Sequence, residues 1–209
     1  MSAEEFIEFI NERRFKGTKE HQHKYISNYY AHEFGKRRHE QLLIVELGVR
    51  DGYDLAMFAD WFQNSQLVGI DRDHYEQLIT WGNNNGRNPA NGWGDYHRHL
   101  GQMGNAKFRK ELAYDDKTIN KFDNESIDYL IDDASHSLDD QLLCIKKYYP
   151  KIKKGGKIIL EDVGFEANSD TCISKICDSG AELGYDIKVF DLRDKTNYGF
   201  SIIIELQKR

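Results

Sequence analysis

The sequence contains little proline, little cysteine and no long apolar run. Its three cysteines, Cys144, Cys172 and Cys177, are an odd number in a chain of ordinary size. We therefore expect reduced thiols in a cytoplasmic protein. No apolar run approaches the roughly 20 residues that cross a bilayer. The acidic, amphipathic start MSAEEFIEFINERR is also unlike a signal peptide.

An excess of positive charge is missing as well. The formal net charge is −6, so the chain as a whole offers no basic surface to nucleic acid or to an anionic membrane. Charged residues make up 31% and apolar residues 39%, which indicates a folded domain and excludes the disordered class. A chain of 209 residues is long enough for one domain with a sheet and its covering helices.

Strand and helix patterns alternate along most of the chain. Residues 1–40 read as polar helices that form a cap, and residues 41–209 as the main domain. Strand patterns lie at 41–47, 66–71, 126–132 and 155–162, and helical patterns at 54–62, 74–81, 108–114, 137–149 and 171–184. Residues 186–192 and 199–206 predict an antiparallel hairpin. This alternation predicts an α/β fold with a mainly parallel sheet covered on both faces.

The unusual polar residues fall where the predicted strands end. Ligands of such sheets bind outside the carboxyl ends of the strands. The residues at these ends are Glu46, Gly48 and Gly52, then Asp71, then 132–136, and finally Glu161 and Asp162. The sequence therefore predicts a ligand site along one edge of the sheet.

The first turn indicates a nucleotide-type cofactor. VELGVRDGYDL places Gly48 and Gly52 between a strand and a helix, a pattern that alone is also a common turn. Asp71 ends the next strand, a position from which a carboxylate accepts both ribose hydroxyls of an adenosine. The G-x-G-x-x-G fingerprint of a dinucleotide site is absent.

Carboxylates around this turn disfavour a phosphate ligand. A pyrophosphate would lie at the start of the helix, where Asp51 and Asp54 would repel it. Together with Glu46, these acids suit a ligand that carries an ammonium and a sulfonium. S-adenosylmethionine is such a ligand, and an NAD-dependent oxidoreductase is disfavoured.

Three acidic side chains are expected at two neighbouring strand ends. Asp133, Glu161 and Asp162 would raise one another's pKa unless a cation compensated them. Oxygen ligands favour Mg²⁺ over Zn²⁺. Glu161 and Asp162 can both face the ion only if the backbone turns there, which Gly164 favours. Asp132 should then face the cofactor or the sheet.

A histidine follows Asp133 by three residues. His136 precedes a helix that Ser137 can cap, and an imidazole there can take a proton from a substrate hydroxyl. The alternative is an acidic helix entry in which His136 only helps to cap. The histidine pairs at 21–23 and 97–99 are expected to be exposed and not to bind metal.

VELGVRDGYDL, VGIDRD, IDDASH and ILEDV, in this order, resemble the metal-dependent sugar O-methyltransferases of macrolide biosynthesis, the macrocin and mycinamicin type. These belong to the class I S-adenosylmethionine-dependent methyltransferases. The resemblance covers about residues 16–165. Its most specific part is a D-x-S-H sequence followed, 28 residues after its Asp, by an E-D pair.

The resemblance implies a Rossmann-like methyltransferase fold with a seven-stranded sheet. It places S-adenosylmethionine at the first two strands, Mg²⁺ on Asp133, Glu161 and Asp162, and the general base at His136. Gln102 falls where the family has an acid near the adenine, and we expect it to contact the base edge. KGTKEHQHKYISNYY is similar to the family's segment ahead of the first strand, but its T-D-K element lacks the acid, so no role is carried over. The candidate cofactor residues are Glu46, Gly48, Gly52, Asp71, Gln102 and Asp132.

The leading hypothesis is therefore a Mg²⁺-assisted O-methyltransferase acting on a sugar or glycoside hydroxyl. A methyltransferase for a catechol or another small diol would use the same site, and a non-catalytic cofactor-binding module is the third candidate. We expect a small-molecule acceptor and neither nucleic acid nor membrane as partner. The acceptor would depend on 82–100, a lid or a plain surface loop, and on 1–40. The helices of 1–40 are candidate contacts of a homo-oligomer.

Overall fold

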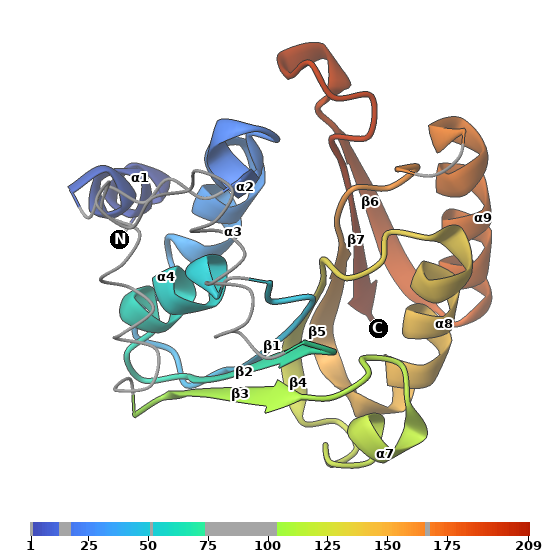
Figure 1. The fold of residues 1–209 in the computed structure, drawn as a ribbon, viewed down its shortest axis with the longest axis horizontal. Coiled ribbons are helices and arrows are strands. Elements are labelled where there is room, and N and C mark those ends of the chain that lie inside the picture. The colour runs from blue at the N-terminus through green and yellow to red at the C-terminus, as the bar shows by residue number, and fades with distance from the viewer. Residues whose placement is uncertain (1, 13–17, 51, 74–103, 166–167) are drawn as a thin grey trace.

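One seven-stranded sheet organises the molecule, with helices on both faces (Figure 1). The computed structural model describes residues 2–12, 18–50, 52–73, 104–165 and 168–209. The strand order is β3-β2-β1-β4-β5-β7-β6. This arrangement confirms the predicted α/β, Rossmann-like fold. Within the described ranges, the helices are too short or too polar to span a bilayer.

The strands are parallel from β3 to β5, whereas β7 runs antiparallel to both of its neighbours, β5 and β6. Their bounds are β1 Leu43–Leu47, β2 Gln66–Asp71, β3 Ala106–Lys110, β4 Ile127–Asp132, β5 Ile152–Leu160, β6 Tyr185–Asp191 and β7 Ile202–Lys208. The predicted C-terminal hairpin is thus confirmed. Because β1, β2, β4 and β5 are parallel, the residues that follow them meet at one edge of the sheet.

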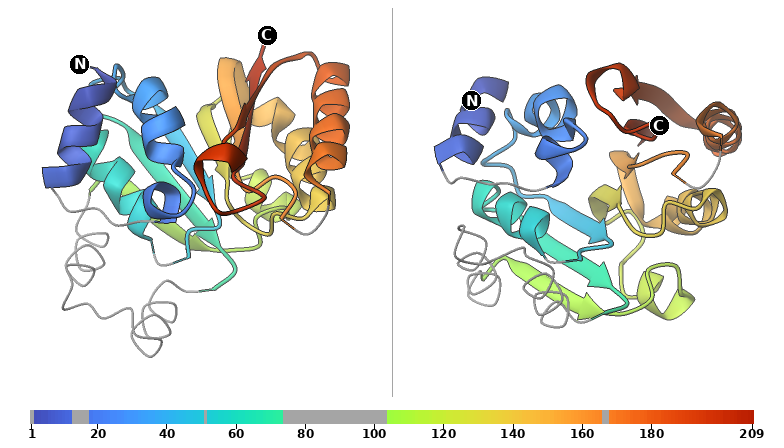
Figure 2. Two further views of the ribbon diagram at one scale, coloured as in Figure 1. Left: turned by 90° about the horizontal axis from the view of Figure 1, so that it is seen from above. Right: turned by 45° about the horizontal axis from the view of Figure 1, so that its top comes forward.

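The helices form one layer on each face (Figure 2). One layer contains α1 Ala3–Glu12, α2 Thr18–His21, the π-helical turn η1 Ile26–Tyr30, α3 Ala31–Phe34 and α4 Tyr53–Trp61. The other contains α7 Asp116–Ile119, α8 Leu138–Tyr148 and α9 Ser169–Glu182. Two short 3-10 turns, η3 Tyr149–Lys151 and η4 Arg193–Lys195, lie in the connections. Each layer buries its own apolar cluster against the sheet.

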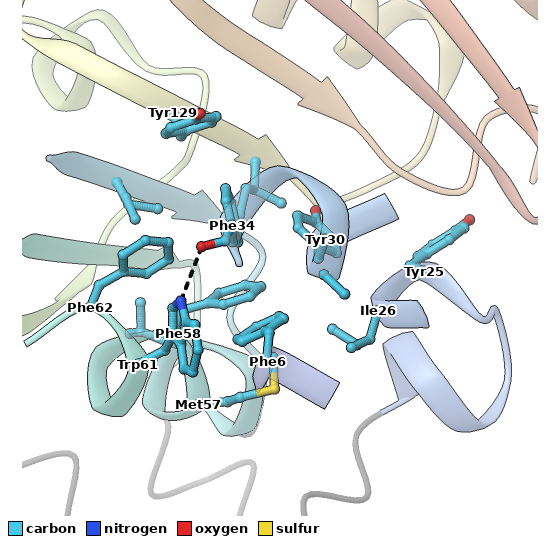
Figure 3. Packing of buried hydrophobic residues seen from close by; sticks show 14 of the residues in the cluster. Phe6, Tyr25, Ile26, Tyr30, Phe34, Met57, Phe58, Trp61, Phe62 and Tyr129 are labelled. Carbon is cyan, nitrogen blue, oxygen red and sulfur yellow. Dashed lines mark hydrogen bonds between the residues drawn. The ribbon is translucent and has the colours of Figure 1, made fainter. Parts of the chain in front are cut away.

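The N-terminal segment is packed into the main core. Phe6, Phe34 and Trp61 are fully buried, and the Trp61 indole Nε1 donates a hydrogen bond to the Phe34 carbonyl at 3.1 Å (Figure 3). Phe34 meets the rings of Phe58 and Tyr129 edge to face. Such aromatic contacts fix α1 and α3 against α4 and the sheet, which places residues 18–30 over the sheet edge.

The helix predicted for residues 108–114 is wrong. This stretch begins in β3, which pairs with β2 in parallel. Residues 106–110 form a strand because they hydrogen-bond to β2. As an edge strand, β3 is partly exposed to solvent and tolerates polar residues whose pattern resembles that of a helix. The predicted cap of α8 is confirmed, since Ser137 Oγ accepts from the Asp140 amide at 3.3 Å. The expectations for 74–81 and 82–100 lie outside the described residues.

Candidate functional site

A cavity of about 830 Å³ lies where β1, β2, β4 and β5 end. This volume is in the upper part of the range for small-molecule sites. The remaining walls include Lys19, Gln22 and His23 from the N-terminal segment. Tyr198 and Phe200, just before β7, also line the cavity. Most of the site residues expected from sequence line it, namely Glu46, Gly48, Asp71, Asp133, His136, Glu161 and Asp162.

The turn after β1 gives close backbone access to the cavity. Gly48 has φ +81°, and a Cβ atom on it would come within 2.1 Å of the Asp133 carbonyl oxygen. Any larger side chain would therefore push β1 and β4 apart. Asp71 is held in place because its two carboxylate oxygens accept from the amides of Arg50, at 2.8 Å, and Asp73, at 2.9 Å.

Glu46 brings a buried carboxylate to the cavity floor. Burial raises its pKa to about 8, and Lys19 opposes that shift. Its Oε2 atom has no hydrogen-bond partner among the described residues. Glu46, Asp54 and Asp133 each place an oxygen within 4.8 Å of the others. An orphaned buried oxygen in acidic surroundings fits a ligand with a cationic donor, as S-adenosylmethionine has.

Two of the described cofactor candidates, Gly52 and Asp132, do not line the cavity. Gly52 has φ +74° and precedes α4, so it serves the turn. Asp132 is buried on the α8 face of the sheet, where Oδ1 accepts from the Tyr114 hydroxyl at 2.8 Å. Burial raises the pKa of Asp132 to about 6. Strand alternation explains this, because Asp133 takes the cavity side. Gln102 and Asp51 lie outside the described residues.

Asp133, Asp162 and His136 line the cavity side by side. His136 Nε2 lies 3.7 Å from Asp133 Oδ1 and 3.9 Å from Asp162 Oδ2. The three ligand atoms are all within 4.8 Å of one another. Two carboxylate oxygens and an imidazole can hold a divalent cation, with open positions left for water or a substrate.

Unusual backbone conformations build this cluster. His136 has φ +59° and Asp162 φ +53°, values that non-glycine residues rarely adopt. Gly164 follows with φ +88°. The chain therefore turns directly after β5, as the sequence predicted. Strained conformations of this kind collect at functional sites because the surrounding fold must hold them.

The N-terminal segment supplies hydrogen-bond donors to the same carboxylates. Lys19 Nζ donates to Asp133 Oδ2 at 2.6 Å and to Glu161 Oε2 at 2.8 Å. The Tyr25 hydroxyl donates to Asp162 Oδ1 at 2.6 Å, and the Tyr30 hydroxyl donates to Glu161 Oε1. Asp133 and Asp162 thus each keep one oxygen turned to the cavity.

Lys19 is a buried cation among acids. Burial alone would lower the pKa of its ammonium, but Asp133 and Glu161 raise that pKa above its ordinary value. Nζ also lies 3.6 Å from Glu46 Oε1. Burial and Asp133 raise the pKa of Glu161. Both Glu161 oxygens are engaged by Lys19 and Tyr30, so Glu161 stands apart from the open cluster of Asp133, Asp162 and His136.

Sequence reasoning missed Lys19, Tyr25 and Tyr30 and misjudged His23. His23 was expected to be exposed, yet it is buried, with Nδ1 3.1 Å from Ser201 Oγ and 3.4 Å from Asp162 Oδ1. Burial lowers its pKa although Asp162 opposes this. The sequence signal for these residues was the KGTKEHQHKYISNYY segment. Because its T-D-K element lacks the acid, no role was assigned to Lys19 beside it.

Comparisons with known proteins agree with the fold. The methyltransferase domain family matches residues 45–163, more than half of the chain. A curated relative from Streptomyces olivaceus, 8-demethyl-8-(2-methoxy-alpha-L-rhamnosyl)-tetracenomycin-C 3'-O-methyltransferase, is 23% identical over 143 residues. That match covers 64% of this chain and 31% of the relative, so the chain spans about a third of the relative's length.

Solved structures share the fold at low identity. The MycE methyltransferase of the mycinamycin pathway, in complex with Mg and S-adenosylhomocysteine, aligns with a TM-score of 0.65 and 15% identity over 98% of this chain and 55% of MycE. Fibrillarin from Methanococcus jannaschii aligns with a TM-score of 0.57 and 12% identity over 81% of this chain and 67% of that chain.

The chain belongs to the methyltransferase domain family. The strand order, the glycine turn after β1 and the acidic cavity floor fit the S-adenosylmethionine-dependent fold of that family.

Proposed function

We propose that this methyltransferase transfers the methyl group to a hydroxyl oxygen of a sugar or glycoside, with Mg²⁺ at Asp133 and Asp162 and His136 as general base. The convergence of Asp133 Oδ1, Asp162 Oδ2 and His136 Nε2 beside the cofactor floor carries this proposal. These oxygens fit Mg²⁺ because Lys19 and Tyr25 occupy the opposite oxygen of each carboxylate and so fix the direction of the free one.

The proposed reaction forms a bond from the acceptor oxygen to the methyl carbon. The bond from that carbon to sulfur breaks, and sulfur keeps the electron pair, which yields S-adenosylhomocysteine. The hydroxyl proton passes to His136 Nε2. A divalent cation, when bound at Asp133 and Asp162, supplies positive charge that lowers the pKa of the hydroxyl. Glu46 faces the cationic cofactor, whose positive charge favours the ionised form of this buried carboxyl, and Asp71 accepts the ribose hydroxyls.

Glu161 has a different part in this proposal from that of the two aspartates. Its carboxylate would hold the cation directly only if Lys19 were displaced, because Lys19 Nζ is 2.8 Å from Oε2. Otherwise Glu161 positions Lys19, which in turn orients Asp133.

The alternative acceptors are a catechol or another small diol. The sugar is favoured because the curated relative is named as acting on a rhamnosyl group and because MycE has been solved with mycinamycin VI. A panel of glycosides and catechols, assayed by release of S-adenosylhomocysteine, separates the two. A non-catalytic cofactor-binding module predicts no release with any acceptor.

Titration with S-adenosylhomocysteine tests the cofactor site. The wild-type protein should bind it and should not bind NAD⁺. Asp71→Asn should weaken binding by about tenfold, since the loss of a charged acceptor costs roughly 1.5 kcal/mol. Asp116→Asn, whose side chain is 79% exposed, is the matched control and should bind normally. No binding by the wild type contradicts the proposal.

Titration with Mg²⁺ tests the cation site separately. Asp133→Asn should abolish the binding heat of Mg²⁺ while affinity for S-adenosylhomocysteine persists, because Asn offers one neutral oxygen in place of a carboxylate. Asp162→Asn should behave in the same way. A Mg²⁺ heat that survives both substitutions would place the ion elsewhere.

A further inference from the structure

Aromatic rings form one wall of the cavity. This wall lies on the side of the carboxylates that is remote from Asp71. Phe165 follows β5, and Tyr198 and Phe200 precede β7. The strand order explains the placement. Since β5 and β7 lie on one side of β4 and β2 lies on the other, the carboxylates of β4 and β5 separate this wall from the nucleotide end.

The wall is continuous with the proposed catalytic group. The Phe165 ring centroid lies 5.6 Å from that of His136 and 4.7 Å from that of Phe200, and the Tyr198 and Phe200 centroids are 5.7 Å apart. His23 closes the inner side, 5.6 Å from Phe200. A molecule resting on these rings would therefore present its edge to His136.

Phe165 is exposed although it is large and apolar. Among the described residues, three large apolar side chains are exposed, and two of them, Leu112 and Phe165, line this cavity. Phe165 is 50% exposed. Ligand cavities are lined mainly by apolar and aromatic side chains with a few polar groups among them, which is the setting of Phe165. Leu112 follows β3 and so lies near Asp71, at the nucleotide end of the cavity. Phe165 lies at the other end, where an acceptor would bind.

The inclination of the rings favours a puckered ligand. The planes of Phe165 and Phe200 meet at 78°, and those of His136 and Phe165 and of Tyr198 and Phe200 at 56°. The C–H groups of a saturated ring project in several directions and can meet several inclined faces at once, whereas a flat catechol offers only two parallel faces and one rim. Gln22 and His23 line the cavity beside this wall and offer polar partners for ring hydroxyls.

We propose that Phe165, Tyr198 and Phe200 bind the apolar ring face of a sugar acceptor and direct one of its hydroxyls to His136. This inference rests on the proposed O-methyltransferase function. Substitutions at these three residues should therefore change the affinity for the acceptor. They should not change the affinity for the cofactor.

Saturation-transfer difference NMR on the protein loaded with S-adenosylhomocysteine tests the wall, with methyl α-L-rhamnopyranoside as the sugar probe and catechol as the comparison. The sugar ring protons should receive saturation from the wild type. Phe165→Ala and Tyr198→Ala should each weaken sugar binding by about tenfold. Phe165→Tyr keeps the aromatic ring and should bind the sugar with an affinity close to that of the wild type.

Val189→Ala is the matched control, because Val189 is an apolar side chain on β6 that is 41% exposed and does not line the cavity. It should bind the sugar as the wild type does. All variants should retain their affinity for S-adenosylhomocysteine.

Three outcomes overturn the inference while the methyltransferase function stands: normal sugar binding by Phe165→Ala and Tyr198→Ala, a Phe165-dependent signal from catechol in place of the sugar, or no sugar signal from the loaded wild type. Failure of the wild type to bind S-adenosylhomocysteine refutes the proposed function itself, and this inference with it.

Discussion

Replacing Lys19 by methionine is expected to lower the free energy of unfolding by about 3–5 kcal/mol. The ammonium lies 2.6 Å from Asp133 and 2.8 Å from Glu161, and its side chain is 2% exposed. Methionine would fill a similar volume but would leave the buried Glu46 and Glu161 and the partly buried Asp133 without a compensating cation. For a chain of this length the loss corresponds to a fall of roughly 10 °C in Tm.

Thermal unfolding with and without Mg²⁺ measures this effect. Lys24→Met is the matched control, because Lys24 is 41% exposed and pairs with Glu20 at 3.6 Å, so its loss should change stability by less than about 1 kcal/mol. Mg²⁺ should raise the Tm of Lys19→Met more than that of the wild type, since the ion replaces the missing positive charge. A Lys19→Met protein as stable as Lys24→Met would show that the acids do not depend on Lys19.

Substitution of His136 by asparagine should reduce turnover by about 10²–10⁴-fold, the usual contribution of a general base. Asparagine tolerates the left-handed backbone at this position, where φ is +59°, better than most residues do. The change therefore removes the basic ring nitrogen without adding backbone strain. Turnover is measured as release of S-adenosylhomocysteine with the glycoside that the wild type methylates fastest.

Affinity for S-adenosylhomocysteine should be unchanged in His136→Asn, because His136 contacts the acceptor side of the cavity. His32→Asn, at an exposed position of α3, is the matched control and should keep full turnover. If His136→Asn retains turnover, another group takes the proton. If it loses Mg²⁺ binding instead, His136 acts as a ligand of the ion.

Local patterns predicted much of the fold and the location of the site. The strands at 43–47, 66–71 and 127–132 follow from short apolar runs bounded by polar turns. The cap of α8 follows from Ser137 and Asp140. The residues at 106–110 could not be assigned in this way, because only pairing with β2 makes them a strand.

The sequence by itself determined which edge of the sheet carries the carboxylates, because parallel strands must end together whatever surrounds them. Only the tertiary structure decided what those carboxylates contact. Lys19 is 114 residues from Asp133 and 142 from Glu161, so no local pattern relates them. The directions of Asp162 and His136 likewise depend on left-handed backbone angles that their neighbours impose. Contacts between distant segments therefore select which oxygens face the cavity.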